Sequence, residues 1–316
     1  MYSAKIIADS YNDYSRITTI EVVMPRIILA EMNTHRAFSR NSASSRAIPS
    51  ARMIDSIEKN PFVPMRWMKD HKGMQGSTYF GEVGSNFFDF VWKKISKESI
   101  DNIKRFQFSE FEEEVCVSKQ ITNRLLEPFM FHKAVITTNE FGFENFISQR
   151  VSKHAEIHMN HVAELMLQAY NDSEAKYLEN GMYHIPYSEG INRDAIRSIV
   201  YSDNSEAHFT QEQWESLFLQ LQIQVSIARL ARTSYTEITN EDQKDPNTEY
   251  QYLRDSKLFH ELKEKGHWSP FEHVAMSQHN KISMGGNLGP GWVQYRKTFI
   301  EESKRDSRVI HKHKLK

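Results

Sequence analysis

The chain has 316 residues, with 40 Lys and Arg residues against 41 Asp and Glu residues and a formal net charge of −1. A domain typically has roughly 100–200 residues, so the length fits one large domain or two smaller ones. The balanced charge gives no whole-chain argument for a nucleic-acid-binding or membrane-binding protein. The single cysteine, Cys116, excludes an intramolecular disulfide and a cysteine-based zinc cluster. With neither a signal peptide nor an apolar run of roughly 18 residues, we expect a soluble protein of the cytoplasm.

The first 50 residues predict a strand, a helix and a loop. Residues 18–24 are rich in β-branched side chains and predict a strand that ends at Pro25. Proline suits the first turn of a helix, so residues 26–32 favour a helix. Residues 37–50 are rich in Ser, Asn and Ala and predict a loop.

The middle of the chain is dominated by helical patterns. Residues 55–120 are rich in Met, Phe and Trp, with four glycines ahead of a charged helical stretch. Residues 134–136 form an apolar run between polar flanks, which predicts a strand. Residues 145–170 carry a broad apolar face and predict one long helix, whereas residues 171–210 are rich in turn formers.

The last third adds two amphipathic helices and a tail. Residues 211–232 and 250–265 predict the helices, and Gly266 occupies the usual position just after a helix. Residues 308–316 form a short basic tail, which favours a solvated terminus over a nucleic-acid arm. Many helices and few strands together predict an α+β protein.

A polar loop at residues 33–46 is the densest cluster of donors in the chain. It holds three arginines, one histidine and four serines, with no acid between the arginines. Several hydroxyl, amide and guanidinium donors converging on one dianion are what a phosphate monoester needs. Composition alone leaves a solvated Ser- and Arg-rich loop equally open.

Three histidines and an arginine recur at helical spacing in the predicted helix at 145–170. They are Arg150, His154, His158 and His161. A pair of histidines four residues apart chelates metals in some helices, but the glutamate that a metalloprotease carries after the first histidine is missing. A metal, an anionic ligand and ordinary structural histidines all remain open readings of this pattern.

Two further segments contain candidate residues. Residues 267–273 carry two histidines, a Glu and a Ser around a proline, at a spacing that favours a structural turn over a metal site. Arg124 lies among apolar residues, where an arginine usually has an anionic partner. Cys116 follows three acids that would raise the pKa of a thiol, which argues against a nucleophile.

Taken together, these segments resemble the flavin-dependent thymidylate synthases. The family signature reads Arg-His-Arg-x-x-Ser-x-Asn-x-x-Ser-x-Arg, and residues 34–46 follow it from its histidine onward. Residues 267–273 are similar to the family's His-x-Ser-Pro-Phe-Glu-His, and residues 231–235 to its Ala-Arg-Val-Ser-Tyr. Residues 124–128 and 145–155 resemble its Arg-x-x-Leu-Pro and Asn-Phe-Leu-x-Leu-Arg-x-x-x-His-Ala elements.

The resemblance implies a fold and an architecture. It implies an α+β core of a mixed sheet with long helices, as a single domain over residues 1–316. The domain would contain an insertion at about 55–120 and end in the basic tail at 308–316. The elements at 231–235 and 267–273 come first in the family and last here, so the motif order is circularly permuted. This order and residues 291–297 resemble a phage-type branch, which would act in a host cytoplasm.

The resemblance also implies a reaction. In this family NADPH reduces bound FAD, methylenetetrahydrofolate supplies one carbon, and C5 of dUMP is reductively methylated to give dTMP. No metal and no enzyme thiol take part, which agrees with the poor placement of Cys116. The family further implies a homotetramer with sites shared between subunits, a small-molecule substrate, and neither a membrane nor a nucleic-acid partner.

Site residues follow position by position from the resemblance. Ser44 and Arg46, assisted by Arg124, would hold the dUMP phosphate. Arg150 would be the catalytic residue, because a guanidinium at the uracil edge favours the ionised, nucleophilic base. Glu31 would lie near the nucleotide, at a position where the family has Gln. The implied contacts with FAD come from His35, Arg36, Asn139, Asn145, His154 and Ser269.

Three departures from the family pattern widen the range of reactions. Thr34 replaces the first Arg of the signature, Ser42 replaces a common Glu, and Phe141 stands where an Arg often contacts FAD. The alternatives are flavin-dependent hydroxymethylation or another C5 modification of a pyrimidine deoxynucleotide. A non-catalytic nucleotide- or nucleic-acid-binding protein and a histidine-ligated metalloenzyme are the alternatives from other classes.

Overall fold

The computed structural model describes residues 1–72, 76, 78–107, 117–203, 209–234, 247–279 and 286–303. Cys116, Tyr235 and the tail at 308–316 lie outside these residues. The described part is a mixture of helices and sheet, so the α+β prediction is confirmed. No helix in this part of the chain has the length and apolar character needed to cross a membrane.

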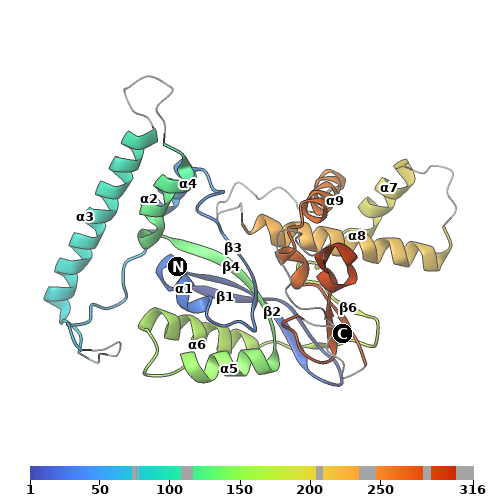
Figure 1. Ribbon diagram of the computed structural model, residues 1–316, viewed down its shortest axis with the longest axis horizontal. Coiled ribbons are helices and arrows are strands. Elements are labelled where there is room, and N and C mark those ends of the chain that lie inside the picture. Colours follow the sequence, from blue (N-terminus) through green and yellow to red (C-terminus); the bar gives the residue numbers. More distant parts are fainter. Residues whose placement is uncertain are drawn as a thin grey trace, which may run out of the picture.

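A five-stranded sheet forms the centre of the molecule (Figure 1). Its order is β3-β4-β2-β1-β5, and all pairs are antiparallel except β1 with β5. The predicted strands at 18–24 and 134–136 are confirmed within β2 and β4. The strands are β1 (Ser3–Tyr11), β2 (Arg16–Pro25), β3 (Ser39–Ser42), β4 (Phe131–Asn139) and β5 (Lys176–Tyr177).

One face of this sheet is covered by helices that carry candidate residues (Figure 1). Pro25 precedes a 3-10 turn, η1 (Arg26–Ile28), and the short helix α1 (Leu29–Met32), which begin where the sequence predicts. Helices α5 (Glu140–Arg150) and α6 (Ile157–Asn171) pack beside them. Their apolar side chains and those of β2 and β4 form one core cluster, which includes Ile136, Phe143, Phe146 and Val162.

The opposite face packs against the C-terminal half of the chain. Val135 of β4 lies in a buried cluster with side chains of α8 (Gln211–Arg232) and α9 (Glu249–Glu264), which confirms both predicted helices. Gly266 follows α9 with a positive φ of 67°, as its predicted position requires. Further elements are β6 (Tyr183–His184), η4 (Ser269–Glu272), β7 (Ala275–Ser277), β8 (Trp292–Gln294), η5 (Tyr295–Thr298) and η6 (Ile300–Ser303).

Three local predictions are wrong. The expected loop at 37–50 contains β3, because pairing with β4 imposes an extended backbone on residues with low strand propensity. The expected helix at 145–170 is two helices, because the Glu156 carboxylate accepts hydrogen bonds from the backbone N–H groups of His158 and Met159 and so starts α6 anew. The turn-rich stretch at 171–210 contains a helix, α7 (Arg193–Asp203).

The segment at 55–120 packs on the rest of the chain through its own apolar cluster. Ile100 and Ile103 of α3 (Glu82–Gln107) are buried with Leu126 and Phe129 of η2 (Asn123–Phe129). Residues of α2 (Ser50–Lys59) complete the cluster, and α4 (Lys119–Thr122) leads back to η2. The segment is thus anchored on η2, which carries Arg124.

We propose that residues 1–316 form a single domain, and a pair of α3 variants tests this. Ile103→Ala removes a fully buried side chain and should lower the free energy of unfolding by about 2–5 kcal/mol within one cooperative transition. Val83→Ala, at an 86% exposed position of the same helix, is the control and should change it by less than about 0.5 kcal/mol. Urea unfolding followed by circular dichroism makes the comparison. A separate early transition that alone responds to Ile103→Ala would contradict the proposal.

Candidate functional site

A hydrogen bond between Arg150 and His35 joins two predicted site residues that are 115 positions apart. Arg150 is the last residue of α5, and its Nε donates to Nε2 of His35 over 2.9 Å. The His35 ring is buried against Phe38 and Phe146, with ring centroids 5.6 and 4.9 Å away. The apolar core of the sheet therefore fixes the imidazole, and the imidazole fixes the guanidinium.

His35 is uncharged in this arrangement. Burial, with the nearby guanidinium groups of Arg150 and Arg40, lowers the pKa of His35 from 6.5 to about 4. A neutral imidazole has one acceptor nitrogen, and Nε2 must be that acceptor because Arg150 can only donate. Arg40 donates to the carbonyl oxygens of Met32 and His35, each over 3.1 Å, and so holds the turn that carries the histidine.

Glu31 and Thr34 complete the surroundings of Arg150. Oε1 of Glu31 lies 3.9 Å from Nη1 of Arg150, and Oγ1 of Thr34 lies 3.4 Å from Nη2. The Thr34 hydroxyl itself donates to the carbonyl oxygen of Glu31 over 2.7 Å. Thr34 therefore contacts the catalytic candidate at the position where the family signature has Arg.

The strand β3 and the residues that follow it connect to the other motif segments, which pack on the opposite face of the sheet from Arg150. Ser39 accepts a hydrogen bond from Gln294 over 2.9 Å, and Gln294 also donates to the carbonyl oxygen of Glu272 in η4. The backbone N–H of Ser44 donates to the carbonyl oxygen of Ser234 over 3.1 Å. The segments near 231–235, 267–273 and 291–297 are thus all attached to the polar loop at 33–46.

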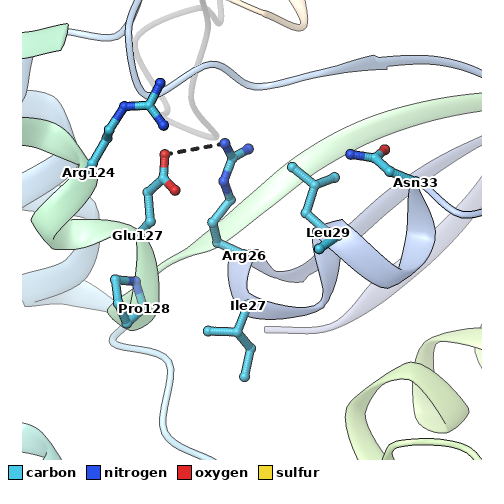
Figure 2. A pocket seen from close by; sticks show the side chains of 8 residues that line it. Arg26, Ile27, Leu29, Asn33, Arg124, Glu127 and Pro128 are labelled. Carbon is cyan, nitrogen blue, oxygen red and sulfur yellow. Dashed lines mark hydrogen bonds and ion pairs between the residues drawn. The ribbon is translucent and has the colours of Figure 1, made fainter. Parts of the chain in front are cut away.

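A pocket of about 410 Å³ lies beside α1 (Figure 2). Its charged lining residues are Arg26, Arg124 and Glu127. Asn33, the residue before Thr34, also lines the pocket. Nη2 of Arg26 lies 3.3 Å from the Glu127 carboxylate, which also accepts a hydrogen bond from the Ser45 hydroxyl over 2.5 Å. Two guanidinium groups against one carboxylate leave the lining with a net positive charge, which suits an anionic group.

Arg46 and Arg124, two of the predicted phosphate ligands, meet at one residue. Nη2 of Arg46 lies 3.5 Å from the side-chain oxygen of Gln120, and Nε of Arg124 donates to the Gln120 backbone oxygen over 3.3 Å. Both arginines are exposed, so their remaining N–H groups face solvent. Ser44 is half-buried two residues before Arg46. The structure therefore brings Arg46 and Arg124 to Gln120, and Arg124 also lines the pocket.

The predicted flavin contacts are less closely grouped. Arg36, Asn145, His154 and Ser269 are exposed. Gly142 lets the segment after Arg36 pack directly on the start of α5, because a Cβ on this glycine would lie 2.9 Å from Cβ of Ala37. Asn139 is buried, and its amide accepts from the N–H of Gly142 and donates to the carbonyl oxygen of Leu288. Asn139 thereby caps the N-terminus of α5.

The break between α5 and α6 separates the histidines that seemed to share one helix face. His158 is buried, with Nδ1 on the Glu156 carboxylate and Nε2 accepting from the backbone N–H of Met65. His154 is exposed in the connecting segment, and His161 packs edge-on against Tyr2. Within the described ranges, no group of three His, Cys, Asp or Glu residues is arranged to hold a metal ion.

His273, from the segment at 267–273, belongs to a buried polar chain. His184 contacts the hydroxyls of Ser10 and Thr19, Thr19 contacts Thr137, and Thr137 contacts Nδ1 of His273, all within 2.9 Å. Burial lowers the pKa of His184 to about 4 and that of His273 to about 3, so both rings are neutral. These contacts join β1, β2 and β4 to a second sheet with the order β6-β7-β8, so the contacts of His273 support the fold.

Sequence reasoning missed Arg26 and gave no role to Glu127. Both line the pocket and are joined by an ion pair, shown by the dashed line in Figure 2. Arg26 follows an apolar strand and precedes two isoleucines, which is the same signal that drew attention to Arg124. Glu127 stood in a quoted motif, but only the fold places its carboxylate beside Ser45 and Arg26.

The chain is similar to several solved structures over about half of its length. A UMP/dUMP methylase, PolB, from Streptomyces cacaoi bound with 5-Br dUMP has 14% identity and a TM-score of 0.43, covering 54% of this chain and 90% of that one. Thymidylate synthase X (ThyX) from Helicobacter pylori with FAD and dUMP, in two structures, has 16% identity and a TM-score of 0.32, covering 49% of this chain and 67% of those chains. No family model and no curated protein matches the sequence.

The low pKa of His35 predicts a loss of stability in acid. The folded pKa of about 4 lies below the ordinary value of 6.5, so this contribution is complete above pH 6.5 and is lost as the pH falls towards 4. When the pH falls from 7 to 4.5, the free energy of unfolding should therefore decrease by about 1–3 kcal/mol less in His35→Gln than in the wild type. Urea titrations at each pH measure both proteins, and parallel losses would show that folding does not lower the pKa of His35.

Proposed function

We propose that the chain is a flavin-dependent enzyme that transfers one carbon to C5 of a pyrimidine deoxynucleoside monophosphate. Methylation of dUMP to dTMP is the reaction that the motif resemblance implies. The observation that carries the proposal is the contact of Arg150 with His35 beside Glu31 and Thr34. These residues come from two separate motifs, and the phosphate candidates Arg46 and Arg124 lie together at Gln120.

Two groups of residues would bind the two ends of the nucleotide, the phosphate and the base. Arg46 and Arg124, with the Ser44 hydroxyl, would bind the phosphate through charge-assisted hydrogen bonds. Arg150 would donate to the polar edge of the base, its plane held by the bond from Nε to neutral His35. A guanidinium fixed before the ligand arrives loses little conformational entropy on binding. The arrangement therefore supports orientation of the base for attack by C5.

Four exposed side chains among the predicted flavin contacts offer groups that suit FAD. Arg36, Asn145, His154 and Ser269 offer a guanidinium, an amide, an imidazole and a hydroxyl, which suit a pyrophosphate and a flavin ring. Asn139 fits as a residue that positions α5 rather than as a direct ligand, because its amide is engaged within the chain. When bound, FAD would supply the capacity to take a hydride from NADPH and pass it on.

Two outcomes of one-carbon transfer differ in their electron balance. Methylation converts dUMP, methylenetetrahydrofolate, NADPH and a proton into dTMP, tetrahydrofolate and NADP⁺. Hydroxymethylation of the same nucleotide takes water in place of NADPH and the proton, and needs no net reductant. Thr34, which contacts Arg150 where the family has Arg, is the observation that keeps hydroxymethylation as a second candidate.

Further parts of the proposal rest on the resemblance alone. These are the circular permutation, the phage-type branch, the homotetramer with shared sites, the cytoplasmic location and the two cosubstrates. A non-catalytic nucleotide-binding protein is the alternative from another class.

Incubation of the purified protein with FAD, NADPH, methylenetetrahydrofolate and a pyrimidine deoxynucleoside monophosphate tests the proposal. Mass spectrometry should find a nucleotide heavier by one CH₂ group for methylation or by one CH₂O group for hydroxymethylation. Arg150→Ala should lower the rate at least about a hundredfold and leave FAD bound, because its guanidinium acts on the base. Arg105→Ala, at an exposed position on α3, is the matched control and should keep the wild-type rate.

The possible failures have different meanings. A protein that stays colourless with added FAD contradicts both enzyme reactions and favours the non-catalytic alternative. Full activity of Arg150→Ala would remove this residue from the site. A product that forms only with NADPH supports methylation, and one that forms equally without it supports hydroxymethylation.

A further inference from the structure

The carboxylate of Glu31 lacks a hydrogen bond in the site. Its Oε1 lies 3.9 Å from Nη1 of Arg150, which is an ion-pair distance beyond hydrogen-bond range. Its Oε2 is buried and has no hydrogen-bond partner among the described residues. An ionised carboxylate only accepts hydrogen bonds, and the Glu31 side chain as a whole is 41% exposed, so a ligand can reach an unfilled acceptor next to a guanidinium.

Arg150 retains donors beside this acceptor. Its Nε is used by His35, and its Nη2 lies at the long distance of 3.4 Å from Thr34. Nη1 reaches no acceptor within hydrogen-bond range in the described part of the chain. The Thr34 hydroxyl donates to a backbone oxygen, so it is no donor for a base. Glu31 and Arg150 together present one acceptor followed by donors.

This order matches the polar edge of cytosine better than that of uracil. Cytosine presents a donor at the N4 amino group, then acceptors at N3 and O2, which a carboxylate and a guanidinium fork complement in sequence. Uracil presents acceptors at O4 and O2 on either side of the N3–H donor. A uracil would therefore need donors on both sides of Glu31, and its O4 would otherwise approach a carboxylate oxygen.

The charge of the cluster points the same way. Glu31 balances Arg150, and His35 is neutral because burial lowers its pKa to about 4. A carboxylate beside Arg150 offsets the stabilisation that its guanidinium would give to a pyrimidine anion, which suits a neutral base. A carboxylate that accepts from the N4 amino group also increases electron density on the ring, which favours reaction at C5.

Glu31 and the pocket are spaced to hold one nucleotide. Arg26 lines the pocket five residues before Glu31, and the helical rise over that distance is roughly 8–10 Å. A deoxyribose bridges such a span between a phosphate in the pocket lined by Arg26 and Arg124 and a base at Glu31. We infer that the base bound at Glu31 and Arg150 is cytosine, so that the substrate is dCMP. The inference rests on the proposed function. In the family that the sequence resembles, the position of Glu31 is Gln.

Equilibrium binding of dCMP and dUMP to the full-length, FAD-loaded protein tests the inference. Wild type should bind dCMP about tenfold to a hundredfold more tightly than dUMP, the discrimination expected from one well-matched pair of hydrogen bonds. Glu31→Gln replaces the acceptor with a group that both donates and accepts, and should reduce this preference to about threefold or less. Glu164→Gln removes an exposed carboxylate of α6 and is the control that should keep the preference.

The possible results separate a failure of the cytosine inference from a failure of the proposed function. Binding of dUMP as tightly as dCMP by wild type overturns the cytosine inference and leaves the proposed function intact. If neither nucleotide binds, the proposed function itself fails. A Glu31→Gln protein that folds and keeps the full preference removes Glu31 as its cause. The wild-type comparison alone decides the question if that variant does not fold.

Discussion

The candidate site depends on the hydrogen bond from Arg150 Nε to a neutral His35. The bond forms only if the imidazole has lost its proton, and burial against Phe38 and Phe146 keeps it in that state. The same aromatic side chains belong to the core between the sheet and α5, so core packing and site geometry are one constraint. A guanidinium at the end of a helix would otherwise explore many rotamers. Here its position is set before any ligand binds.

The strand β3 extends this constraint to the rest of the site. Glu31 and His35 precede β3 in the sequence, and Ser44 and Arg46 follow it. Hydrogen bonds from Gln294 to Ser39 and from Ser44 to Ser234 attach the C-terminal half of the chain to the same loop. The pocket beside α1 adds Arg26 and Glu127. In the proposed function, Arg150 at the end of α5 would hold the base, and Arg46 and Arg124, which meet at Gln120, would hold the phosphate.

Sequence patterns predicted the parts that local chemistry controls. The strand at 18–24, the apolar run at 134–136 and the helices at 211–232 and 250–265 all appear. The strand β3 was missed because its paired residues in β4 lie 92–98 positions away and its own residues favour loops. The joined helix at 145–170 was wrong because Glu156 caps a new start. Motifs made Arg150 and His35 candidate site residues, but only tertiary structure showed that they touch and that Arg26 lines a pocket.

Binding of deoxyribose 5-phosphate and of a pyrimidine deoxynucleoside monophosphate to two arginine variants tests the division of the site most directly. If Arg150 holds the base and Arg124 the phosphate, Arg150→Ala should weaken the nucleotide about tenfold or more and leave the sugar phosphate unchanged. Arg124→Ala should weaken both ligands by the same factor. An Arg150→Ala protein that loses affinity for the sugar phosphate as strongly as for the nucleotide would contradict the account.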